Sequence, residues 1–209
     1  MLLRNSEQDG EKALPITEDQ AGHVKLYVEV FTGEAEESAE STGGLQETFR
    51  RLDDSIEIVQ DQAEATHSYL WVIPSLSWSQ DDTGGDPPSV LLRKDQDTGI
   101  DHERIMELQE QIDTNILSIN FTNPWLVNEI EPGADAVLST FNTTPEAVIG
   151  LIRGEYASTG QMPFTVPASQ ESVEQNASDV PGYAEDPDCA YVDSEANTWD
   201  LRHGLGYED

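Results

Sequence analysis

The run Tyr69–Ile73, YLWVI, decides the fold because each of its side chains is apolar. A strand with one face in water alternates apolar and polar residues, whereas a parallel strand covered on both faces is apolar almost throughout. Further short runs rich in apolar, β-branched and aromatic residues recur along the chain and predict other strands. These runs are Lys25–Phe31, Ile56–Val59, Ile116–Phe121 and Ala136–Phe141.

Helical patterns separate these runs. Leu45–Leu52 carries apolar residues at spacings of four and three, Asp101–Ile112 starts at an aspartate suited to cap a helix, and Pro145–Arg153 has proline in its first turn. Thr32–Gly44 is acidic and contains glycine, so we expect a loop there. Alternating strands and helices predict an α/β three-layer sandwich with a mostly parallel sheet of about five or six strands.

The chain of 209 residues is long enough for one good core. We expect a single domain over residues 1–209, with an α/β core over residues 1–167. Residues 168–209 are polar and rich in Asp, Glu, Asn and Ser, which predicts a largely irregular segment that wraps the core.

Charge and composition restrict the partners. The 42 acidic residues face 10 basic ones, giving a formal net charge of -32, which would repel nucleic acids and anionic membranes. Acid spread along the whole chain suits a protein that works at high salt, where counterions screen the repulsion. We expect no internal disulfide, because Cys189 is the only cysteine, and no cofactor, because nucleotide-binding motifs are absent. Without an apolar run of membrane-spanning length or a signal-peptide pattern, we expect a cytoplasmic protein.

Four stretches, in order, carry a family resemblance. Arg153–Pro167, RGEYASTGQMPFTVP, has a small glycine loop and then an extended run, Phe164–Val166, which predicts a short strand between prolines. With Met1–Ile16, Asn120–Trp125 and His203–Tyr207, this pattern resembles the C-terminal domain of family 3 glycoside hydrolases of the β-glucosidase-like kind. The resemblance spans almost the whole chain and implies the same α/β fold.

The segment after Ile73 is the candidate site. In an open parallel sheet, ligands bind beyond the carboxyl ends of the strands, and a loop longer than about a dozen residues is more often functional than filler. This loop contains Trp78, an aromatic platform for a sugar, and three carboxylates, Asp81, Asp82 and Asp86. We expect Trp78 and Asp86 to bind substrate.

The resemblance assigns roles within this loop. In the family, a carboxylate shortly before a Gly-Asp pair acts as acid/base; Gly85-Asp86 is similar to that pair, so Asp82 is the candidate and Asp81 the alternative. The family usually has Glu at this position. Its nucleophile lies on a preceding barrel domain, which this sequence lacks, so the resemblance implies a barrel on a separate chain, a β-glycoside substrate and little activity of this chain alone.

Other interpretations stay open. Asp81 and Asp82 can equally be solvated charges of an acidic loop, and the chain can be a non-catalytic carbohydrate-binding or structural module, or merely flavodoxin-like in architecture. The acidic stretch Glu185–Asp188, with Asp193 and Glu195, could hold calcium, but it lacks EF-hand spacing. The four histidines lack metal-ligand spacing, so we expect no metal site.

Overall fold

The computed structural model describes residues 1–8, 10–75, 90–96, 98–175 and 188–207. Its strands are β1 (Leu2–Asn5), β2 (Glu7–Gln8), β3 (Glu11–Lys12), β4 (Lys25–Phe31), β5 (Glu57–Val59), β6 (His67–Val72), β7 (Thr114–Asn120) and β8 (Ala136–Thr140). Its helices are α1 (Glu18–Ala21), α2 (Ala35–Leu52), the short 3-10 helix Gln62–Glu64, α3 (His102–Gln111), α4 (Pro145–Ile152) and α5 (Gln170–Gln175).

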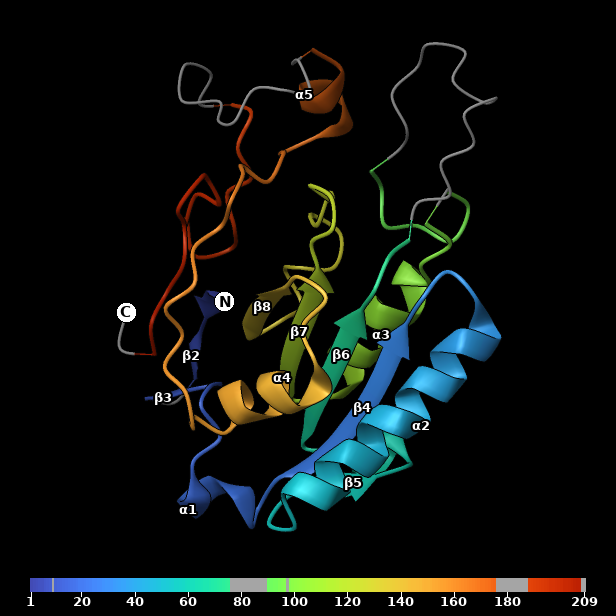
Figure 1. The fold of residues 1–209 in the computed structure, drawn as a ribbon, viewed down its shortest axis with the longest axis vertical. Coiled ribbons are helices and arrows are strands. Elements are labelled where there is room, and N and C mark those ends of the chain that lie inside the picture. Colours follow the sequence, from blue (N-terminus) through green and yellow to red (C-terminus); the bar gives the residue numbers. More distant parts are fainter. Residues whose placement is uncertain (9, 76–89, 97, 176–187, 208–209) are drawn as a thin grey trace.

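Six strands form the main sheet in the order β1-β8-β7-β6-β4-β5. The five from β4 to β8 are parallel, and β1 joins β8 antiparallel. The predicted α/β fold with a mostly parallel sheet is confirmed. The arrows of β4, β6 and β7 point toward the same end of the molecule (Figure 1).

Strand β6 is apolar from Tyr69 onward because an apolar cluster covers each of its faces. Tyr69 and Trp71 of β6 pack in the cluster that includes Phe49 of α2, while Leu70 and Val72 pack in the opposite cluster with Ile105 of α3. Helices α2 and α4 lie in front of the sheet and α3 behind it (Figure 1). Both faces of β6 are therefore covered, as its sequence predicts.

Helix α2 corrects one prediction. Thr32–Gly44 is not all loop, because α2 already begins at Ala35 and runs through Gly43 and Gly44. The first half of the helix lacks an apolar stripe because polar residues, spaced by four, turn toward the edge of β4 instead. A Cβ at either glycine would meet nothing within 4 Å, so these glycines reflect no packing demand.

The extended run near the end of the core is not a strand either. The backbone of Val166 bonds Trp199 and Tyr191, with N···O distances of 2.9 and 2.8 Å, but the pairing amounts to an isolated bridge between Pro167 and Ala190, with Ala168 N bonding Cys189 O at 2.8 Å. Pro163 and Pro167 on either side have no N–H to extend it. These bonds tie the C-terminal segment, residues 188–207, to the core.

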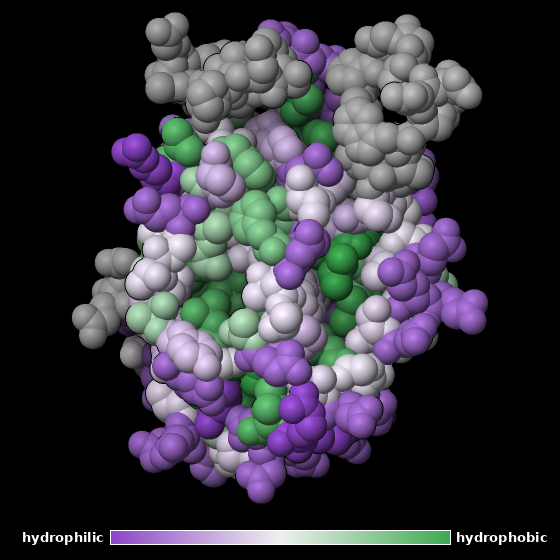
Figure 2. Space-filling model, in the orientation of Figure 1, coloured by the Kyte–Doolittle hydropathy of each residue, from purple (hydrophilic) through white to green (hydrophobic). Residues whose placement is uncertain are grey.

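Polar and apolar residues occupy different parts of one face of the molecule. On the face covered by α2 and α4, hydrophilic residues occupy the rim and hydrophobic residues show in the middle (Figure 2). None of the helices in the described ranges is both long and apolar enough to span a membrane.

Candidate functional site

The four residues predicted from the loop, Trp78, Asp81, Asp82 and Asp86, lie outside the described residues. The structure describes where the chain leaves the sheet before them and where it returns. The N–H of Ile73, just after β6, donates to the carbonyl of Phe31 at 2.8 Å. On the return, the carbonyl of Val90 accepts from Leu126 N, beyond the end of β7, at 2.9 Å. Both anchor points lie at the carboxyl end of the parallel strands.

A close backbone crossing fixes this end of the sheet. A Cβ on Gly33, which follows β4, would stand 2.8 Å from the carbonyl oxygen of Thr98, so only glycine fits there. Gly99 has a positive φ of 62°, and a Cβ there would stand 2.8 Å from the carbonyl oxygen of Gly33. The segment that returns toward α3 is thereby pressed against the loop after β4.

The residue after this crossing caps α3. Asp101 accepts from the N–H of Arg104 at 3.4 Å, and its carboxylate lies 2.6 Å from Lys94 Nζ. The hydrogen bond from Lys94 lowers the pKa of Asp101, so the cap stays charged. The predicted capping role of Asp101 is confirmed, and it holds the start of α3 in place.

Two asparagines meet at the ends of β7 and β8. Asn142 N donates to Asn120 Oδ1 at 2.8 Å, and Asn120 Nδ2 donates to Asn142 Oδ1 at 3.1 Å. Asn142 has a positive φ of 51°, which asparagine tolerates better than most residues. The carbonyl of Asn120 accepts from Trp125 Nε1 at 2.9 Å. Because Trp125 is fully buried, its ring packs in the core and is not accessible to a sugar.

An exposed ring stands beside these amides. Phe141, directly after β8, is 36% exposed, and its ring centroid lies 6.1 Å from that of Phe164 in an edge-on arrangement. Phe164 in turn lies 6.2 Å from Phe121. An apolar ring next to amide groups can stack on a sugar face. The sequence shows an aromatic residue at the end of three predicted strands, Phe31, Phe121 and Phe141, but it could not show which ring is exposed.

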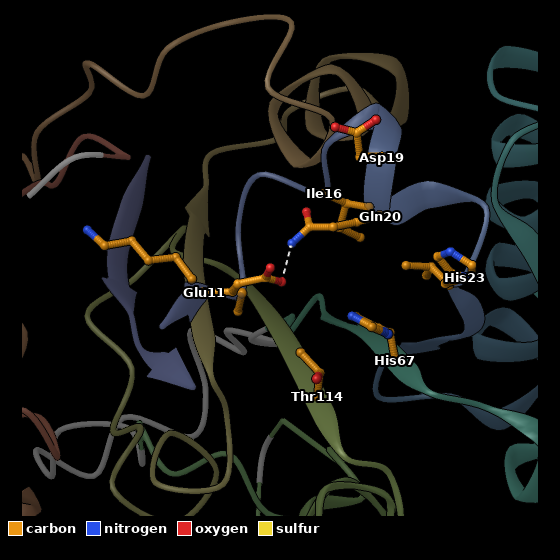
Figure 3. A pocket seen from close by; sticks show the side chains of 10 residues that line it. Glu11, Ile16, Asp19, Gln20, His23, His67 and Thr114 are labelled. Carbon is orange, nitrogen blue, oxygen red and sulfur yellow. Dashed lines mark hydrogen bonds between the residues drawn. The ribbon is translucent and has the colours of Figure 1, made fainter. Parts of the chain in front are cut away.

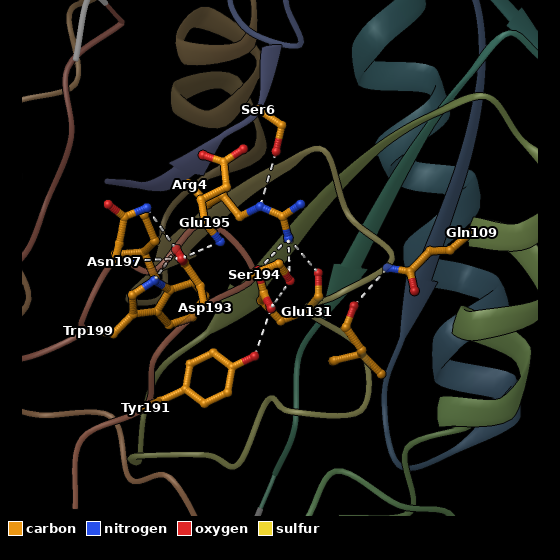
Figure 4. A network of polar contacts seen from close by, with 12 residues as sticks. Arg4, Ser6, Gln109, Glu131, Tyr191, Asp193, Ser194, Glu195, Asn197 and Trp199 are labelled. Carbon is orange, nitrogen blue, oxygen red and sulfur yellow. Dashed lines mark hydrogen bonds and ion pairs between the residues drawn. The ribbon is translucent and has the colours of Figure 1, made fainter. Parts of the chain in front are cut away.

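A buried polar network lies behind the sheet edge (Figure 4). The Glu131 side chain is fully buried and forms an ion pair with Arg4 of β1. Tyr191 Oη donates to Glu131 Oε2 at 2.7 Å, and Ser194 Oγ donates to the same oxygen at 3.2 Å. Burial, and next the hydrogen bond to Glu131, raises the pKa of Tyr191 well above its usual range. The network joins the N-terminal strand to the C-terminal segment and exposes no carboxylate to a substrate.

The acidic stretch considered for calcium is only partly described, from Asp188 on. Asp193 is buried and accepts from Trp199 Nε1 at 2.9 Å and from the backbone N–H of Asn197 at 2.8 Å. Its oxygens therefore shape the turn that ends the network. Across the described ranges, no group of three or more His, Cys, Asp or Glu side chains is placed to hold a metal ion.

A cavity of about 640 Å³ opens at the opposite, amino end of the sheet (Figure 3). His23 and His67 face it from one side, and Gln20 donates to Glu11 at 3.0 Å across from them. Burial lowers the pKa of His67, whose Nδ1 lies 2.9 Å from Thr66 Oγ1, so the imidazole is held neutral. This cavity lies at the end of the sheet remote from the anchors of the predicted loop.

Part of the chain is similar in sequence to β-glucosidases. The chain is 32% identical over 94 residues to β-glucosidase C of Emericella nidulans and 29% identical over 92 residues to a probable β-glucosidase C of Aspergillus flavus. These matches cover 45% and 44% of this chain but only 14% and 13% of the relatives. No protein-family model matches.

Solved structures show the same fold. A β-glucosidase from Erythrobacter marinus superposes with a TM-score of 0.63 at 15% identity, and β-glucosidase 3B from Thermotoga neapolitana with 0.56 at 16%. Each match covers 99% of this chain and 33% or 36% of the other, so the chain spans about a third of those proteins. The chain is thus similar in sequence over part of its length to β-glucosidases, and in fold over nearly all of its length to a part of solved β-glucosidase structures.

Proposed function

We propose that the chain is the C-terminal domain of a retaining β-glycoside hydrolase of family 3 type, and that it completes the active site of a barrel domain outside this sequence. One observation carries the proposal. The loop containing Trp78 and the aspartates is anchored at the carboxyl end of the sheet, by Ile73 on one side and Val90 on the other. That end is where open α/β sheets place their ligands.

The proposed chemistry divides two carboxylates between the two domains. The barrel supplies the nucleophile, which attacks the anomeric carbon, while Asp82, or Asp81 in its place, protonates the departing glycosidic oxygen. The same carboxylate then removes a proton from the water that hydrolyses the glycosyl-enzyme. Hydrolysis with retention of the anomeric configuration requires the two carboxyl groups to lie about 5 to 5.5 Å apart. Trp78 stacks on the sugar and Asp86 accepts from a sugar hydroxyl.

A second candidate is a non-catalytic carbohydrate-binding module. The exposed Phe141 ring beside the amides of Asn120 and Asn142 favours it, because this surface needs no barrel to contact a sugar. In this alternative, Asp81 and Asp82 are solvated charges and their substitution changes nothing.

A complementation assay, in which a barrel domain is added to the chain, distinguishes the hydrolase domain from the binding module. The chain is assayed on aryl β-glycosides at high salt, alone and with a family 3 barrel domain, and the expected result is hydrolysis by the mixture only. Asp82→Asn should lower kcat/KM of the mixture by roughly two to four orders of magnitude, as loss of general acid/base catalysis does. The matched variant Asp81→Asn should have a much smaller effect. No hydrolysis by any mixture of folded chains would favour the binding module.

A further inference from the structure

A second cavity, of about 630 Å³, runs along the outer edge of β4. It exists because β5 is short. β5 pairs only with residues from Lys25 to Tyr27, so among the described residues no strand covers the second half of β4 on the side opposite β6. Side chains of α2 bond that edge instead. Thr42 Oγ1 accepts from Val30 N at 2.9 Å, and Gln46 Nε2 donates to Val28 O at 3.2 Å. The cavity therefore occupies the position that a longer β5 would fill beside the second half of β4.

One wall of the cavity carries a cluster of polar side chains that includes Arg104 and Glu29. Tyr27 Oη donates to Glu29 Oε2 at 2.7 Å, and Arg104 Nη2 lies 3.4 Å from both of these oxygens. Gln62 Oε1 accepts from the same Nη2, and Glu107 Oε2 accepts from Arg104 Nη1 at 3.1 Å, so the guanidinium is held in place. The two 3.4 Å contacts are weak, so Arg104 Nη2 can exchange them for a shorter bond to a ligand while Gln62 and Glu107 keep the guanidinium in place. The side chains of Arg104 and Glu29 are 28% and 24% exposed, which leaves them accessible yet partly shielded from water. Hydrogen bonds formed in such surroundings are stronger than in water.

The charge of the lining selects the kind of ligand. Among the described residues that line the cavity, the acids Glu29 and Asp101 are matched by two bases, Lys94 and Arg104. The cavity is thus neutral by count on a chain whose net charge is -32. An anion would be repelled by the rest of the protein, and nothing in the cavity favours a cation over the rest of the acidic surface. A neutral ligand with many hydroxyls suits a wall where donors and acceptors alternate.

We propose that this cavity binds a neutral sugar of one or two rings, held by Arg104 and Glu29 beside the outer edge of β4. Its volume falls within the range of about 300 to 1,000 Å³ that is typical of small-molecule sites. The choice of a sugar among neutral polyols rests on the proposed function, whereas the cavity and its polar wall do not.

Binding of glucose and cellobiose to the chain alone tests the proposal, with calorimetry for affinity and amide chemical shifts for location. Two variants remove the site in different ways. Arg104→Gln removes the guanidinium, and Ala39→Trp fills the cavity from the exposed surface of α2. Each should weaken binding at least tenfold. The matched control, His23→Gln in the amino-end cavity, should bind like the parent chain.

The expected shifts include the amides of Val28 and Val30. Absence of binding, unchanged affinity in both variants that remain folded by circular dichroism, or shifts confined to the surroundings of Phe141 would each overturn the proposal. Because no barrel is present, the outcome does not depend on the complementation assay. Failure of the proposed function and failure of this site are therefore seen in different experiments.

Discussion

Backbone N–H and C=O groups at the edge of a sheet lack a neighbouring strand, and the two edges of this sheet satisfy them in different ways. At one edge, β1 is covered by backbone, because Leu205 N donates to Leu2 O at 2.9 Å. A buried ion pair between Arg4 and Glu131 lies behind it. At the other edge, β4 extends beyond β5 and is covered only by the side chains of α2. We call these the closed edge and the open edge.

The difference indicates which edge contributes more to the stability of the fold and which edge leaves space for a ligand. A buried carboxylate that has lost its partner is strongly destabilising, so the closed edge depends on every member of its network. Neutral hydroxyl and amide groups at the open edge satisfy the backbone and discourage pairing with another strand. They also leave space beside the strand. Substitutions at the closed edge should therefore change stability most.

The largest effect is expected for Arg4→Met, which leaves the buried Glu131 carboxylate without its cation. The free energy of unfolding should fall by about 3 to 5 kcal/mol. Denaturant titration at constant salt measures it. The double variant Arg4→Met/Glu131→Leu, which removes both charges, should be more stable than the single one. A loss below about 1 kcal/mol in the single variant would contradict the closed edge as described.

Tyr191→Phe should cost about 2 kcal/mol near neutral pH, because it removes a hydrogen bond to a charged, buried carboxylate. The pH dependence has a definite sign. Unfolded tyrosine loses its proton near pH 10, whereas burial keeps Tyr191 protonated in the folded chain, so the folded state binds more protons above that pH. The parent chain should lose stability as pH rises above about 10, and the variant should lose less. Equal slopes in the two proteins would refute this assignment.

Thr42→Val tests the open edge. The variant keeps the shape of the side chain but leaves Val30 N without its acceptor, at a cost of about 1 to 2 kcal/mol. Amide exchange of Val30 should accelerate more than that of Val28, because α2 bonds Val28 through its carbonyl, by Gln46, and not through Thr42. The control is Thr48→Val on the same helix, since Thr48 Oγ1 bonds only the preceding turn, at Gly44 O. If both variants behave alike, the hydroxyl of Thr42 is not what protects the strand.

Gly44→Ala should give the smallest change, and it should stabilise. The position lies inside α2 and a Cβ there meets nothing within 4 Å, so the gain is the helix propensity of alanine, about 0.5 to 1 kcal/mol. A higher melting temperature with unchanged binding at the open edge is the expected result. A destabilised variant would mean that this helix turn is not formed as described.

Sequence patterns predicted the elements whose own residues carry the signal. The all-apolar run at Tyr69 follows from burial on both faces, and the helix start at Asp101 from local capping. The first half of α2 was missed because its contacts with β4 are polar, so no apolar period marks it. The closed edge could not be foreseen, because Arg4 and Glu131 stand 127 positions apart and meet only in the fold. The site residues of the loop stay a prediction.

Azide rescue tests the central claim, a carboxylate of this chain working as acid/base in a barrel's active site, most directly. The mixture of barrel and Asp82→Asn chain is given an aryl β-glucoside whose leaving group needs no protonation, so that the glycosyl-enzyme forms but water attacks it slowly. Azide is an anionic nucleophile, so it attacks the glycosyl-enzyme without a general base to remove a proton. The account predicts faster turnover with azide and β-glucosyl azide as the product, with no such change for the parent chain. Turnover of the Asp82→Asn mixture at the parent rate, with no azide product, would contradict it.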